Sequence, residues 1–315
     1  MISSIDRRRI FIFVAIAYGG SIALGLAVYF TGGIGNPPFD LSRSAFALMA
    51  GLMFVPLVAN IVTRLVTREG WSNTLLRPNF RRGWRFYLAA WFLPVLATIL
   101  GGVIYFLLFP SRFDPSMTSM REMGALPEDM NAGMYLLVQV GSVLSVAAAV
   151  NLLLGFGEEF GWRAYLLQKL MPLGSRKAVL LVGVIHAVWH YPLVFMGYEY
   201  GFSYWGAPVV GPMIYVVFVL WLSVFLAWVT LRSGSVWPAA LGHGVINASA
   251  LLMRAFVGGD PHWLTGPQTM GIVGGLGYAL LALLIFFSAR GLAPIASPAP
   301  AVPKLGREAP QGAAI

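Results

Sequence analysis

Residues 155–167 read GFGEEFGWRAYLL, a stretch in which two adjacent carboxylates and an arginine close an uncharged run of about twenty residues. An ionisable side chain at the edge of a membrane is costly unless it has a partner or a function, so Glu158, Glu159 and Arg163 are candidate functional residues. In a helix, Glu159 and Arg163 lie on one face and can form an ion pair, whereas Glu158 points about 100° away. We therefore expect one carboxylate to be held by the arginine and the other to be available for chemistry.

The composition places these charges in a membrane protein. The chain of 315 residues is 58% hydrophobic and 10% charged, which is more apolar surface than a soluble core can bury. The net charge of +9 does not indicate nucleic-acid binding, because the basic residues sit in short links between apolar runs. The chain has no cysteine, which excludes disulfides, thiolate metal sites and a thiol nucleophile. We expect an all-α, polytopic bundle whose partner is the lipid bilayer.

Eight apolar runs of about 20 residues predict eight transmembrane helices. With a cytoplasmic N-terminus, all of the 21 Lys and Arg residues except Arg43, Arg112, Arg121 and Arg254 fall in links on the cytoplasmic side, as the positive-inside rule requires. We therefore expect a multi-pass protein of the cell (inner or plasma) membrane with both termini in the cytoplasm. The predicted spans are 10–31, 45–63, 86–109, 134–156, 178–197, 207–231, 236–257 and 268–289; links 64–85 and 157–177 are expected inside, and links 110–133 and 198–206 outside.

The domain organisation follows from the same pattern. Residues 1–290 are expected to form one domain, with its motif-bearing core at about 134–257. The Pro/Ala-rich residues 291–315 are too poor in large apolar side chains to pack, which predicts a disordered cytoplasmic tail.

Three of the four histidines fall inside predicted spans. His186 and His190 are four residues apart, and Asn247 follows His243 by four, so each pair shares a helix face. With Glu158, these residues would bring a base, a proton carrier and hydrogen-bond donors together from three helices. Because the acidic pair lies near the predicted cytoplasmic end of its span, we expect a cavity that opens to the cytoplasm.

Addition of water to an amide is the chemistry that these side chains suit. A glutamate can take a proton from water, a histidine can position that water, and a histidine with an asparagine amide can donate to the oxyanion. The alternative is a zinc site, since His186, His190, His243 and Glu158 could supply its ligands and leave a water activated.

Three segments resemble the motifs of a known family. EEFGWR resembles EExxxR, VWH followed by Pro192 resembles the second, histidine-bearing motif, and HGVIN resembles HxxxN. Together they are similar to the CAAX protease and bacteriocin-processing enzyme family, also called the Abi or CPBP family, over about residues 153–250. The resemblance implies an intramembrane endopeptidase of eight helices with its site open to the cytoplasm.

The resemblance also implies roles for individual residues. Four residues before the second-motif histidine the family often has an aromatic residue; here it is His186, which either lies beside the site or extends it. No metal or other cofactor is expected on this reading, with zinc as the alternative. Glu158 would be the general base, His190 its partner on the water, His243 and Asn247 the oxyanion contacts, and Glu159 with Arg163 the supporting pair.

Two non-proteolytic classes compete with this interpretation. A proton-coupled transporter also uses buried Glu and His, but no pair of broken helices in matching halves supports it. A non-catalytic membrane scaffold or immunity protein would use the motifs only to hold helices together. For an enzyme, the expected substrate is a membrane-associated protein or peptide, and the sequence does not determine whether it is lipidated.

Overall fold

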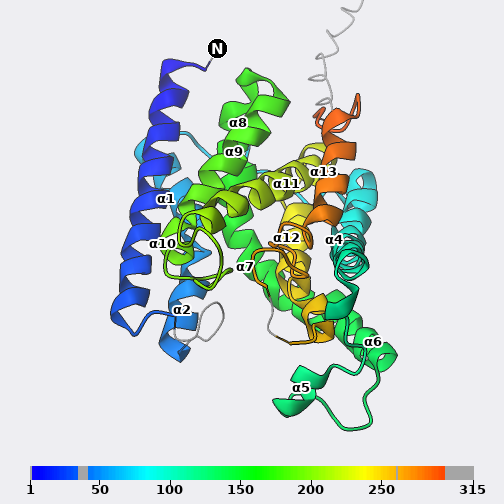
Figure 1. Ribbon diagram of the computed structural model, residues 1–315. Coiled ribbons are helices and arrows are strands. Elements are labelled where there is room, and N and C mark those ends of the chain that lie inside the picture. Colours follow the sequence, from blue (N-terminus) through cyan, green and yellow to red (C-terminus); the bar gives the residue numbers. More distant parts are fainter. Residues whose placement is uncertain (1, 35–41, 260–261, 295–315) are drawn as a thin grey trace, which may run out of the picture.

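The computed structural model describes residues 2–34, 42–259 and 262–294, and within these ranges the protein is a bundle of helices (Figure 1). An isolated β-bridge joins Phe113 and Val257. The predicted fold class, an all-α membrane bundle, is confirmed. Most of the predicted tail, residues 295–315, lies outside the described residues.

Five of the described helices are long and apolar enough to cross a membrane. The other three predicted spans contain shorter helices. Pro192 and Pro238 each lie in the first turn of one of these helices, where proline is tolerated because the first N–H groups have no partner within the helix. The five long helices are α1 (Ser4–Phe30), the consecutive α2 (Arg43–Leu52) and α3 (Val55–Val66), α4 (Phe80–Leu108), a helix through 132–173 and α11 (Val210–Ser233). The shorter ones are α9 (Ser175–Trp189), α10 (Tyr191–Val194), α12 (Trp237–Ser249) and α13 (Leu276–Phe287).

The helix through residues 132–173 is the central element and carries the acidic pair. It joins α6 (Ala132–Ser142), α7 (Ala148–Gly161) and α8 (Leu167–Leu170) through π-helical turns at Val143–Ala147 and Trp162–Leu166. Residues 157–173 of the predicted link 157–177 are therefore helical. Glu158 precedes Leu173 by 15 residues, roughly 22 Å along the axis, so the carboxylates lie deep in the bundle.

Small residues let α2 and α3 approach α7 at the acidic pair. A Cβ atom added to Gly157 would lie 2.6 Å from the carbonyl oxygen of Met53, and one added to Gly161 would lie 2.6 Å from that of Pro56. These separations are shorter than van der Waals contact, so only glycine fits. On its other side α7 packs along α12, which also contacts α4.

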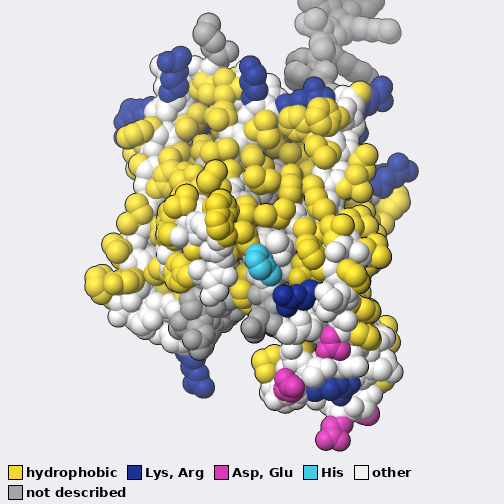
Figure 2. All heavy atoms as spheres, in the orientation of Figure 1, with side chains coloured by type: hydrophobic (Ala, Val, Ile, Leu, Met, Phe, Trp, Pro, Cys, Tyr) yellow, Lys and Arg dark blue, Asp and Glu magenta, His cyan; other side chains and the backbone are white. Residues whose placement is uncertain are grey.

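The charged side chains gather at the two ends of the bundle. In Figure 2, Lys and Arg cluster at the end that carries the N-terminus, acidic residues lie at the opposite end, and a hydrophobic band separates them. At the basic end Glu69 pairs with Lys169 and with Arg9 (3.3 Å) and accepts a hydrogen bond from Tyr165 (3.0 Å). Burial alone would raise the pKa of Glu69, but the bonds and charge of Lys169 outweigh it and lower that pKa. This network joins α1, the end of α3 and α8. The opposite end carries the short helix α5 (Thr118–Glu122), within the predicted outer link.

Candidate active site

Glu159 is held on two sides. Its Oε1 accepts a hydrogen bond from Nη1 of Arg163 at 2.9 Å and another from Nδ1 of His243 at 2.8 Å. Both partners in the ion pair are completely buried, so Arg163 compensates a charge that has no access to water. The pairing predicted from the i, i+4 spacing is confirmed, and the contact with α12 adds a second partner that the spacing does not reveal.

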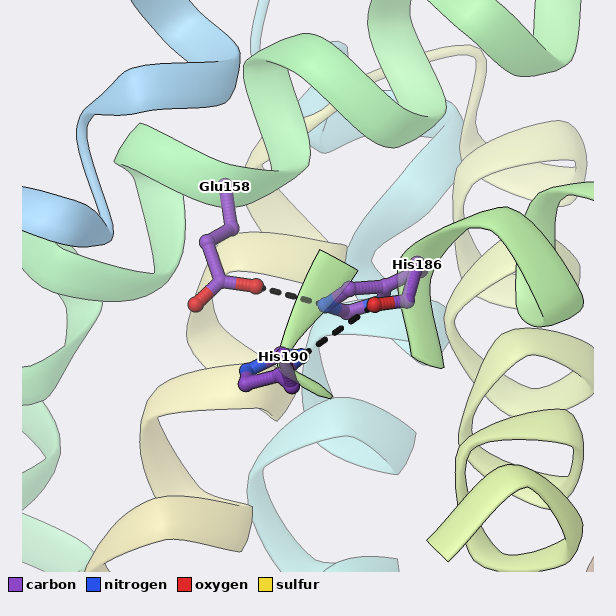
Figure 3. Close-up of side chains that lie close together, drawn as sticks. All are labelled: Glu158, His186 and His190. Carbon is purple, nitrogen blue, oxygen red and sulfur yellow. Dashed lines mark hydrogen bonds and ion pairs between the residues drawn. The ribbon is translucent and has the colours of Figure 1, made fainter. Parts of the chain in front are cut away.

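Glu158 points toward His186 of α9, as Figure 3 shows. Its Oε2 lies 2.7 Å from Nε2 of His186, a hydrogen-bond distance. The indole of Trp162 stacks on the other face of this imidazole, with ring centroids 5.0 Å apart. His186 is therefore the immediate partner of Glu158. The sequence left its role open, and the four-residue spacing of His186 and His190 was the one signal that pointed to it.

His190 lies one turn further along the chain and is oriented by the backbone. Its Nδ1 is 3.2 Å from the carbonyl oxygen of His186, to which it donates (Figure 3). This bond selects the tautomer with the proton on Nδ1, so Nε2 of the neutral ring is an acceptor. The ring packs edge-on against Tyr215 of α11, with centroids 5.3 Å apart. Two elements thus fix the orientation of an imidazole that can accept a hydrogen bond from water.

His243 lies between the two carboxylates. Its Nδ1 donates to Glu159, and its Nε2 is 4.0 Å from Oε1 of Glu158. A neutral ring with its proton on Nδ1 could not donate from Nε2, so the predicted oxyanion role requires the doubly protonated imidazolium. Asn247, one turn later on α12, faces the same cavity.

A cavity of about 340 Å³ brings these side chains together. Glu158, His186, His190, His243 and Asn247 line it, and most of the other lining residues are apolar. Glu159 and Arg163 lie behind this lining, consistent with a supporting position. The exposed residues Phe46 and Asn247 are among the lining residues, so the cavity reaches the surface of the molecule.

The cavity lies in the half of the bundle remote from the basic end. On α9 its lining begins at His186 and on α12 at His243, and α2 contributes Phe46 and Met49. Helix α2 lies at the end opposite the N-terminus in Figure 1. That the cavity opens to the cytoplasm stays a prediction.

The residues that could hold a metal ion are Glu158, His186 and His190, whose donor atoms all lie within 4.8 Å of one another. Two ligands of a tetrahedral zinc at about 2.0 Å are roughly 3.3 Å apart. The 2.7 Å between Glu158 and His186 is shorter and fits a direct hydrogen bond. His243 is not in this group, so the predicted set of three histidines and Glu158 does not assemble as one ligand cluster among the described residues.

Fold and site together define a multi-pass helical membrane protein with a buried Glu/His cluster at an open cavity. The family model described as type II CAAX prenyl endopeptidase Rce1-like matches residues 140–249, a segment that contains all six predicted site residues. A curated relative, CAAX prenyl protease 2 of Methanococcus maripaludis, is 28% identical over 98 residues, which are 30% of this chain and 36% of the relative. The chain thus spans about a third of that relative's length. Through this segment the chain is similar to the CAAX protease and bacteriocin-processing enzyme family.

Proposed function

We propose that this protein is an intramembrane endopeptidase that hydrolyses a peptide bond of a membrane-associated protein or peptide with water activated by Glu158. The observation that carries the proposal is a buried carboxylate, hydrogen-bonded by His186, at the wall of a cavity otherwise lined mainly by apolar residues. The similarity of residues 140–249 to the CAAX prenyl endopeptidase family supports the reaction class. The apolar walls suit a substrate segment taken from the membrane.

In the proposed reaction Glu158 removes a proton from water while Nε2 of His190 accepts the second hydrogen bond of that water. The oxygen of the water bonds to the carbonyl carbon of the substrate, and the carbonyl oxygen becomes an oxyanion to which His243 and Asn247 donate. The carbon–nitrogen bond then breaks, and the proton held by Glu158 passes to the leaving amine. Glu159 holds His243 in place and offsets its charge, and Arg163 holds Glu159.

Replacement of the proposed base tests this assignment. Glu158→Gln keeps the size of the side chain and removes the base, so peptidase activity should fall by at least about 10³-fold. The purified full-length protein in lipid nanodiscs would be assayed with a quenched fluorescent peptide, and its folding checked by thermal unfolding. Glu122→Gln, an exposed residue of α5, is the matched control and should keep full activity. A folded Glu158→Gln protein with near wild-type turnover would show that another group is the base.

A zinc-dependent peptidase is the second candidate, favoured by the cluster of Glu158, His186 and His190. The short Glu158–His186 contact favours the metal-independent reaction, so we expect chelators to leave activity unchanged. Protein purified without added metal should contain well under one zinc per chain by mass spectrometry. Stoichiometric zinc whose removal stops cleavage, and whose return restores it, would assign these three side chains as ligands instead.

A further inference from the structure

A second carboxyl group lines the same cavity and has no role in the proposed reaction. Glu199 lies in the link between α10 and α11 and is 8% exposed. Its Oε2 is buried without a hydrogen-bond partner. Buried polar atoms are nearly always paired inside a folded protein, so an unpaired carboxyl oxygen at a cavity wall indicates a ligand that completes it.

The backbone conformation of Glu199 supports the same conclusion. Its φ is +78°, a left-handed conformation that is unfavourable for a residue with a Cβ atom and that glycine adopts freely. The fold therefore keeps a strained backbone and a buried unpaired carboxyl group at one position. Strain of this kind persists where the side chain serves a function.

A second unpaired polar atom lines the cavity from another link. The Oγ1 of Thr269, in the segment between α12 and α13, is buried without a hydrogen-bond partner, and Thr269 also lines the cavity. Burial raises the pKa of the Tyr198 hydroxyl, and the charges of Glu199 and Glu158 both raise it further. Both carboxyl groups are therefore within electrostatic range of one hydroxyl at the cavity wall.

The charges that line the cavity are unbalanced. Its lining residues include Glu158 and Glu199 but no lysine or arginine. A free carboxylate of a substrate would thus meet no lysine or arginine there, whereas an ammonium or guanidinium group would supply the missing partner of Glu199.

We propose that Glu199, assisted by Thr269, forms a subsite that binds a positively charged group of the peptide substrate. The identification of the ligand as a peptide rests on the proposed function. Burial raises the pKa of Glu199 to about 8, and a bound cation would return the group to its ionised form. The subsite would select substrates with a basic group near the scissile bond and disfavour a free carboxylate at that place.

Binding measured without cleavage tests the subsite. The full-length Glu158→Gln protein in nanodiscs would be titrated with fluorescent leucine–alanine peptides: one acetylated with a central lysine, one acetylated with norleucine in its place, and one with norleucine and a free amino terminus. One of the two cationic peptides should bind at least about tenfold more tightly than the neutral peptide. The preferred peptide shows whether the cation is a side chain or the terminal amine.

Variants of the subsite give the controls. Adding Glu199→Gln should remove the preference for the cationic peptide, Thr269→Val should reduce it, and Glu122→Gln should leave it intact. Glu199→Gly should also remove the preference, yet raise the melting temperature, because glycine relieves the left-handed strain. If Glu199 served only to stabilise the fold, the melting temperature of Glu199→Gly would fall. Equal binding of all three peptides, or no binding of any, would overturn the proposal. The peptidase assignment can fail separately, since Glu158 contributes nothing to this readout.

Discussion

Removal of Arg163 should be the most damaging single change near the site. Arg163 and Glu159 are both completely buried and 2.9 Å apart, so Arg163→Ala leaves a carboxylate with His243 as its remaining partner. Breaking a buried pair in this way costs about 3–5 kcal/mol. Since one kcal/mol shifts the melting temperature of a large domain by about 2–4 °C, we expect a fall of roughly 6–20 °C. Activity should also fall, because Glu159 orients His243.

A double-mutant cycle separates the ion pair from packing. The single variants Arg163→Met and Glu159→Gln each leave one buried charge without its partner, whereas the double variant leaves no unpaired charge. The double variant should therefore be more stable than the sum of the two single losses of stability predicts. Melting temperatures in detergent and peptide cleavage would be measured for all variants, with Lys177→Ala, an exposed basic residue, as the control. Additive losses, or an Arg163→Ala protein within about 1 °C of wild type, would refute this account of the pair.

Three further predictions concern the second histidine, the basic end and the topology. His186→Phe should lower turnover about 10- to 100-fold, because it removes the 2.7 Å hydrogen bond to the proposed base. His190→Ala should lower turnover at least as much. An unchanged rate in either variant would contradict the proposed role of that histidine. The pKa of Glu69 is lowered in the folded protein. Its contribution to the free energy of unfolding is therefore full above its unfolded-state pKa of about 4.5 and is lost as the pH falls through the folded-state pKa. Glu69→Gln should therefore make the free energy of unfolding depend less on pH on the acid side. A cysteine at Ser119 should react with impermeant reagents from outside and one at Lys177 from the cytoplasm, and the reverse pattern would invert the predicted topology.

The His186→Phe prediction shows how the structure changed one interpretation. From the sequence alone, an aromatic residue at this position matched the family pattern, so phenylalanine would have been expected to preserve most activity. The contact between His186 and Glu158 instead gives the imidazole a direct role beside the proposed base. Sequence spacing placed His186 on the face of His190, but it could not place α7 opposite that face.

The sequence by itself determined the fold class and the residues of the candidate site. An apolar fraction that exceeds what a soluble core can bury requires a membrane bundle, and intramembrane charges are rare enough to identify Glu158, Glu159 and Arg163 directly. The pairing of Glu159 with Arg163 was also predictable, because it depends only on the pitch of one helix.

The tertiary structure decided everything that depends on contacts between helices. It extended the helix of the acidic pair to residue 173, since the charges that resembled the start of a loop are neutralised by partners inside the bundle. It assigned His186 to Glu158 and His243 to Glu159, and it moved the cavity to the half of the bundle away from the basic end. It also brought Glu199, an unremarkable residue of a predicted outer link, to the wall of that cavity. Local periodicity fixes which side chains share a helix face, but the direction in which each face points is set by packing against residues distant in the chain.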